Sequence, residues 1–153
     1  MSLDSLYQEI ILEHNRKPRN FRVMADANRR IDANNPLCGD QLTLWVKLEG
    51  DRVADVSFQG LGCAISKASA SLMTAAVKGK TAAEAVAIAR HMNDLLTGKL
   101  DVDKERESLG SLAALSGVSR FPMRVKCASM AWHAHEAALD ENNAEAVVAG
   151  SAS

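Results

Sequence analysis

The chain has few aromatic residues, which make up only 4% of its 153 positions. Because 47% of the residues are nevertheless hydrophobic, a core can form, but it must be built from Ala, Leu, Val, Ile and Met. Long apolar runs are also missing, since the apolar stretches are short and rich in Ala and Ser. A helix that spans a bilayer needs about 20 consecutive, mostly apolar residues. The sequence therefore predicts no membrane association.

An excess of charge of either sign is absent too, with 18 basic and 19 acidic residues. Nucleic-acid binding needs a clustered basic surface. The one short basic run, residues 16–19, is typical of a solvated loop. We therefore expect no nucleic-acid partner.

Cysteine is scarce, and its odd number of three argues against a disulfide framework. The first residues lack a charged segment followed by an apolar one, so no secretion signal is expected. Free thiols without a signal indicate the reducing cytoplasm. The length fits one domain, which we place at residues 1–140. Residues 141–153 are polar and rich in small residues, and they predict a mobile tail.

The hydrophobic pattern predicts an α+β fold with a small antiparallel sheet of about three strands covered by helices. Helical spacing and caps predict helices over residues 3–15, 63–79, 81–96 and 122–139. Period-two alternation predicts strands over residues 42–48 and 53–58, with a third, edge strand over 28–33. Residues 99–121 show no clear period, apart from a short apolar turn around Leu112 and Leu115.

The three cysteines all lie where the chain turns or starts a helix. Cys38 is followed by Gly39 and Asp40, and glycine permits the sharp turn that would bring a thiolate and a carboxylate onto one ion. Cys63 is predicted to begin a helix, and Cys127 to lie in the first turn of the last helix, where the helix dipole favours an anion. Three thiolates and a carboxylate are an allowed zinc ligand set. A free cysteine can also be simply a small buried hydrophobe, and the residues alone leave both readings open.

Two positive residues flank the third cysteine. Arg124 and Lys126 stand at a predicted helix start, where a cation is unfavourable against the dipole. A zinc site with three thiolates and a carboxylate would carry negative charge, which Arg124 and Lys126 could offset. The alternative is that both side chains are solvated at the helix end.

The four histidines carry less weight as ligands. His14 lies on the apolar stripe of the first helix and is expected to be packed or capped there. His91 has no cysteine nearby in the sequence. His133 and His135 follow Cys127 by six and eight residues, so neither has the i, i+4 spacing that would place it beside the thiol on a helix.

Several segments together resemble a known family. They are Leu6-Tyr7 with Ile10, His14 and Pro18-Arg19-Asn20, then residues 35–40 (Asn-Pro-Leu-Cys-Gly-Asp), and then residues 60–66 (Gly-Leu-Gly-Cys-Ala-Ile-Ser). Over residues 3–139 the chain resembles the U-type (NifU N-terminal, IscU-like) iron–sulfur scaffold superfamily. The long segment between Cys63 and Cys127, and Lys126 where the scaffold branch has histidine, are similar to the branch of SufU-type zinc-dependent sulfurtransferases.

This resemblance implies roles for individual residues. Cys38, Asp40, Cys63 and Cys127 would bind Zn²⁺, and Cys38 would accept persulfide sulfur. The donor would be a SufS-type, PLP-dependent cysteine desulfurase, which Arg124 would help to engage. Downstream cluster assembly proteins would receive the sulfur.

Two alternatives remain at this stage. The chain could be a scaffold on which an iron–sulfur cluster is assembled, because three thiolates and an oxygen can also hold iron. It could instead be a zinc-stabilised adaptor without sulfur chemistry. Lys126 and the long segment favour the sulfurtransferase.

Overall fold

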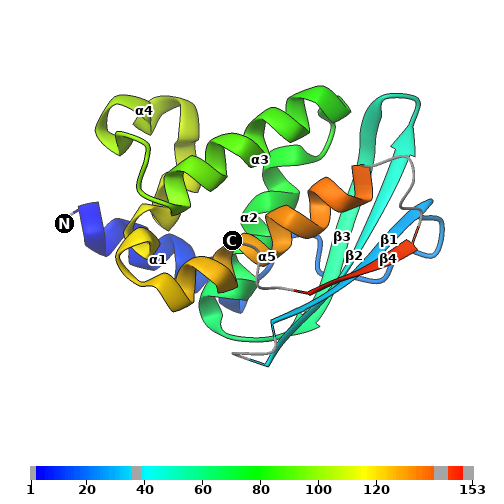
Figure 1. Cartoon of the computed structure of the whole chain (residues 1–153), viewed down its shortest axis with the longest axis horizontal. Helices are drawn as coiled ribbons and strands as arrows, with labels where there is room; N and C mark the ends of the chain where they lie inside the picture. Colours follow the sequence, from blue (N-terminus) through cyan, green and yellow to red (C-terminus); the bar gives the residue numbers. More distant parts are fainter. Residues whose placement is uncertain (1–2, 36–38, 140–144, 150–153) are drawn as a thin grey trace.

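The computed structural model describes residues 3–35, 39–139 and 145–149. Its elements follow the order α1 (Leu3–Arg16), β1 (Arg29–Asn35), β2 (Asp40–Glu49), β3 (Arg52–Leu61), α2 (Ala64–Val77), α3 (Ala82–Leu96), α4 (Val102–Leu109), the 3₁₀ helix η1 (Gly110–Arg120), α5 (Pro122–Leu139) and β4 (Glu145–Ala149). The predicted α+β fold, with an antiparallel sheet covered by helices, is confirmed (Figure 1).

The sheet has the strand order β3-β2-β1-β4. Strands β1, β2 and β3 pair antiparallel, as predicted, and β4 pairs in parallel with β1. Strand β1 therefore has a neighbour on both sides, and the prediction that it forms an edge is wrong. Strand β4 lies in the segment for which the sequence predicts a mobile tail, and that mobility stays a prediction.

The helices gather on one side of the sheet (Figure 1). Helix α5 packs against β1 and β2, and α2 packs against β3 and α5. The sheet side of the core consists of inward-facing residues of the three antiparallel strands, including Ile31, Leu44, Val46, Val56 and Phe58. The helix side includes Met73, Met92, Leu115 and Met130. The core is thus mainly aliphatic, as the low aromatic content requires.

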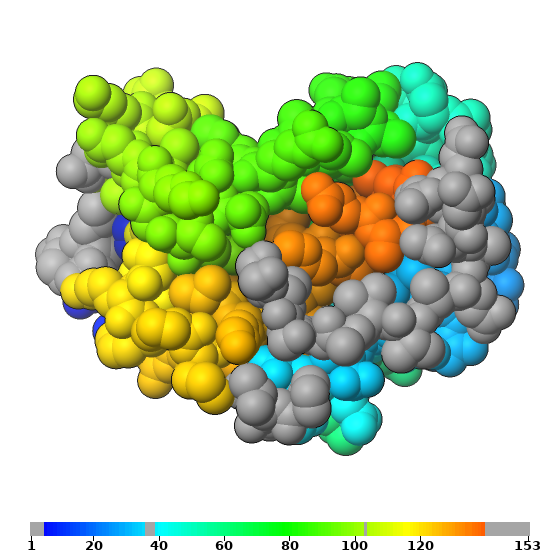
Figure 2. All heavy atoms as spheres, viewed as in Figure 1, coloured from blue at the N-terminus to red at the C-terminus, as the bar shows by residue number. Residues whose placement is uncertain are grey.

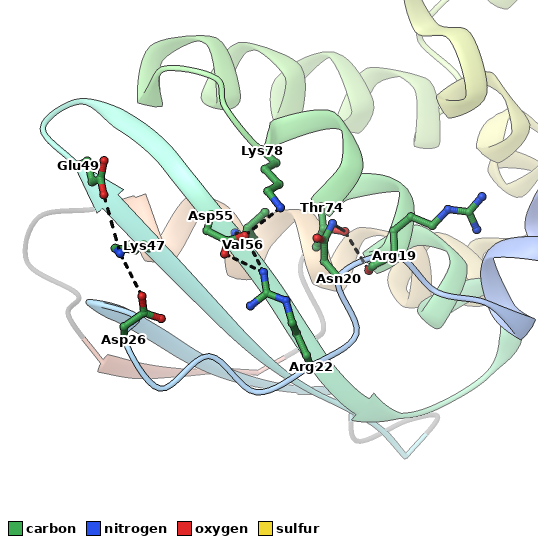
Figure 3. A network of polar contacts seen from close by, with 10 residues as sticks. All are labelled: Arg19, Asn20, Arg22, Asp26, Lys47, Glu49, Asp55, Val56, Thr74 and Lys78. Atoms are coloured by element: carbon green, nitrogen blue, oxygen red, sulfur yellow. Dashed lines mark hydrogen bonds and ion pairs between the residues drawn. The ribbon is translucent and has the colours of Figure 1, made fainter.

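The segment between α1 and β1 is tied to β3 and α2 by polar contacts (Figure 3). Arg22 donates to both carboxylate oxygens of Asp55 at 2.8 and 2.7 Å, and Nζ of Lys78 lies 3.3 Å from the same carboxylate. Burial raises the pKa of Asp55, but hydrogen bonds from Arg22, the Val56 N–H and Lys78 outweigh it and lower the pKa. The Nδ2 amide of Asn20 also donates to Oγ1 of Thr74 at 3.1 Å. These contacts fix the path of the chain from α1 into the sheet.

The start of α3 is fixed by its cap. The hydroxyl of Thr81 accepts from the N–H of Glu84, and the Glu84 carboxylate accepts from the N–H of Thr81, so the two residues form a capping box. The helix predicted from residue 81 is thereby confirmed. Helix α4, by contrast, occupies a stretch without a clear apolar period and was missed by the sequence prediction.

Among the described residues, no helix combines the length and the apolar character needed to cross a membrane.

Candidate metal centre

Three of the four predicted ligands come together in space. The side chains of Asp40, Cys63 and Cys127 each offer one ligand atom, and these atoms lie within 4.8 Å of one another. They come from the start of β2, the N-cap of α2 and the body of α5. Among the described residues this is the one group of at least three Cys, His, Asp or Glu side chains with such convergence. The fourth predicted ligand, Cys38, lies outside the described residues.

Asp40 is buried, with 1% of its surface exposed, and its two oxygens have different surroundings. Its Oδ1 accepts a hydrogen bond from the backbone N–H of Cys63 at 3.0 Å. Its Oδ2 lies 3.8 Å from Sγ of Cys63. Because Oδ1 is already held by the chain, Oδ2 is the oxygen that can bind an ion beside the thiol.

Gly62 makes this position of Asp40 possible. A Cβ atom at Gly62 would lie 2.7 Å from Oδ1 of Asp40, which is closer than real Cβ contacts allow. The carboxylate can thus approach the backbone before Cys63 only because residue 62 has no side chain. The sequence pattern around residue 62 did not predict this role in holding Asp40.

Cys63 is the N-cap of α2, which confirms the prediction that it begins a helix. Its backbone is extended, and its Sγ accepts from the N–H of Ser66 at 3.4 Å. An N-cap side chain that takes a free helix N–H in this way is the usual solution for a helix start. The residue is exposed, so the thiol can be reached from solvent.

The prediction that Cys127 lies in the first helical turn is wrong. Helix α5 starts at Pro122, so Cys127 is its sixth residue and lies in the second turn. The effect of the helix dipole falls off within the first turn. The thiol is buried, with 4% exposed, and the Nδ2 amide of Asn35 lies 3.9 Å from its Sγ. The sulfur of Cys127 is therefore in contact with the side-chain amide of Asn35 and not with the N–H groups of the helix start.

Asn35 was missed by the sequence analysis, although the sequence carries a signal for it. In β1, Ile31, Ala33 and Asn35 alternate with more exposed residues and share the buried face of the strand. A polar side chain on a buried strand face must find a hydrogen-bond partner inside the protein. Such a residue beside a cysteine motif is a candidate neighbour of the site.

The donor set fits a zinc ion. Two thiols and one carboxylate oxygen converge, and zinc takes four such ligands in a tetrahedron. Cys38 is two residues from Asp40, so their Cα atoms are at most about 7 Å apart. The described residues on the two sides of the segment 36–38 are joined by a hydrogen bond of 2.8 Å from the N–H of Gly39 to the carbonyl oxygen of Asn35.

Arg124 and Lys126 occupy different surroundings near Cys127. Arg124 is exposed, and its guanidinium carbon lies 5.0 Å from the centre of the Phe121 ring. It lines a pocket of about 390 Å³ to which α1 contributes Tyr7 and α2 contributes Ile65. Lys126 is half-buried and precedes Cys127 directly, so the two side chains do not share a helix face. None of the ion pairs found among the described residues involves either cation.

The histidines have other surroundings, and none belongs to the group formed by Asp40, Cys63 and Cys127 among the described residues. His14 is buried, with its Nδ1 2.7 Å from Oγ of Ser71. His91 lies 3.7 Å from the Glu105 carboxylate. His133 lines a groove of about 400 Å³ between α3 and α5, seen between the green and orange surfaces of Figure 2. His135 is fully buried, and neither ring nitrogen has a hydrogen-bond partner in the described structure.

Known proteins share both the sequence and the fold of this chain. The chain is 46% identical over 135 residues to the zinc-dependent sulfurtransferase SufU of Bacillus subtilis (strain 168), covering 88% of this chain and 90% of that protein. It is 37% identical over 137 residues to the iron–sulfur cluster assembly scaffold protein IscU of Streptococcus pyogenes serotype M1, covering 90% and 84%.

A solved structure is similar along nearly its whole length. It is the putative iron–sulfur cluster assembly scaffold protein for the SUF system from Fervidobacterium islandicum AW-1, with a TM-score of 0.80 and 32% identity. The match covers 91% of this chain and 100% of that one. The family model of the NifU-like N-terminal domain matches residues 6–144. The chain therefore belongs to the NifU-like N-terminal domain family.

Proposed function

We propose that this chain is a zinc-dependent sulfurtransferase that accepts persulfide sulfur from a PLP-dependent cysteine desulfurase for iron–sulfur cluster assembly in the cytoplasm. The observation that carries the proposal is the convergence of Asp40, Cys63 and Cys127 within 4.8 Å. The similarity to a relative named as a zinc-dependent sulfurtransferase supports it. The family membership supports the broader role in iron–sulfur cluster assembly.

Four residues would hold the ion. Cys38, Cys63 and Cys127 would supply thiolates, and Asp40 would supply Oδ2, since its Oδ1 already accepts from Cys63 N–H. Bound zinc would keep the thiols deprotonated and the site closed. Three thiolates and a carboxylate would leave a negative site, which Lys126 offsets in this proposal.

The chemical step is a thiol–disulfide type exchange at Cys38. Cys38 must first leave the ion, and its free thiolate then attacks the terminal sulfur of the desulfurase persulfide. The new bond joins Sγ of Cys38 to that sulfur, and the sulfur–sulfur bond of the desulfurase breaks. The cysteine of the desulfurase leaves as a thiolate and keeps the electron pair, so no external oxidant or reductant is needed.

The surface beside the site offers a place for the partner. Arg124 is exposed, free of ion pairs with the described residues, and three residues from Cys127 on the same helix face. Leu12 and Phe121, which line the nearby pocket, are 51% and 48% exposed, and Met123 next to Arg124 in the sequence is 52% exposed. Exposed apolar groups with a free arginine are typical of protein contact surfaces, and the proposal assigns Arg124 to the SufS-type desulfurase.

The test combines metal analysis with desulfurase turnover. The purified protein should be colourless, contain one zinc per chain, and raise the rate at which a SufS-type desulfurase releases alanine from cysteine. Cys38→Ser should abolish this stimulation, and mass spectrometry should find the extra sulfur atom on Cys38 in the wild type. A matched control is Ser111→Ala on the exposed part of η1, which should keep full stimulation.

The scaffold function is the second candidate, favoured by the 37% identity to a relative named as a scaffold protein. In that case the assembled cluster is the cargo, and reconstitution with iron and sulfide should give a brown protein with cluster absorbance. A zinc-stabilised adaptor is the remaining outcome. It is indicated if Cys38→Ser lowers zinc affinity but leaves the desulfurase stimulation intact.

A further inference from the structure

All three converging ligand groups are in hydrogen-bonding contact with the chain. Asp40 accepts from the backbone N–H of Cys63, and Cys63 accepts from the backbone N–H of Ser66. Cys127 differs, because a side-chain amide, Nδ2 of Asn35, lies 3.9 Å from its Sγ. A backbone donor persists through most substitutions, whereas this side-chain donor can be removed by one.

Cys127 needs a donor more than Cys63 does. Cys63 is exposed and capped at a helix start, where water and free N–H groups can stabilise a thiolate. Cys127 is buried in the second turn of α5, beyond the unpaired N–H groups of the helix start. A buried anion without hydrogen bonds is costly. The Nδ2 amide of Asn35 is a hydrogen-bond donor within reach of this sulfur.

Asn35 also stands at the junction of the site with the Cys38 loop. It is fully buried, and in the register of the sheet it pairs with Asp40. Its carbonyl oxygen accepts from Gly39 N–H at 2.8 Å, and Gly39 directly precedes Asp40. One residue thus contacts the start of β2 through its backbone and Cys127 through its side chain.

We propose that Asn35 is a positioning residue of the metal centre, whose amide holds the Cys127 sulfur in its ligating orientation and makes Cys127 the anchored thiolate of the site. This rests on the proposed function in one respect, namely that Cys127 binds the ion. Cys63 is exposed and Cys127 is buried, so the anchor sits on the buried side of the site. Outer hydrogen-bond partners of metal ligands typically change metal affinity by about 10–100-fold when they are removed.

The first measurement needs no substitution. In protein loaded with ¹¹³Cd, NMR should show the Asn35 side-chain amide proton shifted on metal binding and coupled to cadmium through the sulfur. The amide is assigned by its absence in Asn35→Ala. An Asn35 amide unchanged by metal loading would overturn the proposal.

The second measurement compares variants with cobalt and zinc in the full-length protein. Asn35→Leu and Asn35→Ala should move the thiolate-to-cobalt charge-transfer band to lower energy and transfer zinc to a chelator about 10–100-fold faster. Asn34→Ala is the matched control, because Asn34 is the exposed neighbour in β1 and should leave both readouts as in the wild type. Asn35 variants that behave like Asn34→Ala would refute the positioning role.

These measurements also separate this inference from the proposed function. A cobalt spectrum whose intensity fits fewer than three thiolates, or one that Cys127→Ser leaves unchanged, would count against the metal site itself. A three-thiolate spectrum that depends on Cys127 but not on Asn35 would be consistent with the proposed function and would refute only the positioning role of Asn35.

Discussion

The backbone N–H of Cys63 donates to Oδ1 of Asp40 at 3.0 Å, so the start of α2 and the start of β2 are joined at the candidate metal centre without any ion. This bond leaves Oδ2 of Asp40 beside the Cys63 sulfur, 3.8 Å away. Asp40 therefore has two separable tasks, one as hydrogen-bond acceptor for the chain and one as anionic ligand. Substitutions at Asp40 can tell them apart.

Asp40→Ala removes both tasks, and Asp40→Asn removes only the negative charge, because the amide oxygen can still accept from Cys63 N–H. We expect both variants to lose zinc to a chelator faster than the wild type, since a coordination position is weakened or opened. Asp40→Ala should in addition lower the free energy of unfolding by about 1 kcal/mol, because the part-buried hydrogen bond from the N–H of Cys63 is lost. Asp51→Ala, in the exposed turn between β2 and β3, is the control. Unchanged zinc retention in Asp40→Ala would mean that Asp40 is not a ligand.

Gly62→Ala should displace the carboxylate of Asp40 without changing Asp40 itself. The added Cβ would meet Oδ1 of Asp40 at 2.7 Å, so the carboxylate or the backbone must shift. Overpacking of this kind typically costs about 1–3 kcal/mol of stability, and the displaced carboxylate should release zinc faster. Gly117→Ala is the matched control, because its Cβ would approach no atom closer than 3.5 Å. Equal zinc retention in the two glycine variants would show that Gly62 does not set the position of Asp40.

We expect the buried His135 side chain to make the folded protein less stable in acid. Complete burial lowers its pKa from 6.5 to about 4. In the unfolded chain His135 binds a proton below about pH 6.5, whereas in the folded chain it does so only below about pH 4. The free energy of unfolding therefore falls as the pH drops through this range. Between pH 7.5 and pH 5 this group should cost about 2 kcal/mol.

The measurement is urea unfolding of metal-free wild type and His135→Met at both pH values. The variant should show a pH-dependent loss smaller by about 2 kcal/mol, while His14, whose pKa is also lowered mainly by burial, acts alike in both proteins. An identical pH dependence in wild type and variant would refute the prediction.

Arg124→Ala should weaken desulfurase stimulation with little effect on folding. The side chain is exposed, and its contact with the Phe121 ring is worth about 0.5–1 kcal/mol at most. Zinc content should stay at the wild-type level, and the concentration needed for half-maximal stimulation should rise. Arg90→Ala on the exposed side of α3 provides the comparison. A large stability loss with normal stimulation would make Arg124 a structural residue.

Lys126→Ala tests the charge balance at the metal centre. If the half-buried ammonium offsets the negative site, its removal should lower zinc affinity or change the alkylation rate of the neighbouring thiolates. Lys99→Ala, an exposed lysine after α3, controls for the loss of one positive charge. If zinc affinity, thiol reactivity and desulfurase binding are all unchanged in Lys126→Ala, Lys126 is a solvated helix residue.

The sequence predicted those parts of the fold that depend on local chemistry. The capping box of Thr81 and Glu84 and the cap at Cys63 gave the starts of α3 and α2, since both depend on residues within one helical turn. Helix α4 was missed because its residues, Val102–Leu109, are mostly charged and show no continuous apolar face.

The candidate site was predicted by residue type but not in its detail. The sequence identified Asp40, Cys63 and Cys127, which the structure brings together. It placed Cys127 one helical turn too early, although the correctly predicted start at Pro122 makes Cys127 the sixth residue of the helix. The contact with Asn35 joins residues 92 positions apart, and no local pattern reports such a pairing.

The origin of the three converging side chains has a consequence for how the protein is made. Asp40 begins a strand in the first third of the chain, whereas Cys127 sits in the last helix of the described fold. A ribosome must release most of the polypeptide before these groups can meet. During synthesis Asp40 and Cys63 are therefore available well ahead of Cys127, and the complete pocket for an ion exists only after the final helix has docked on the sheet.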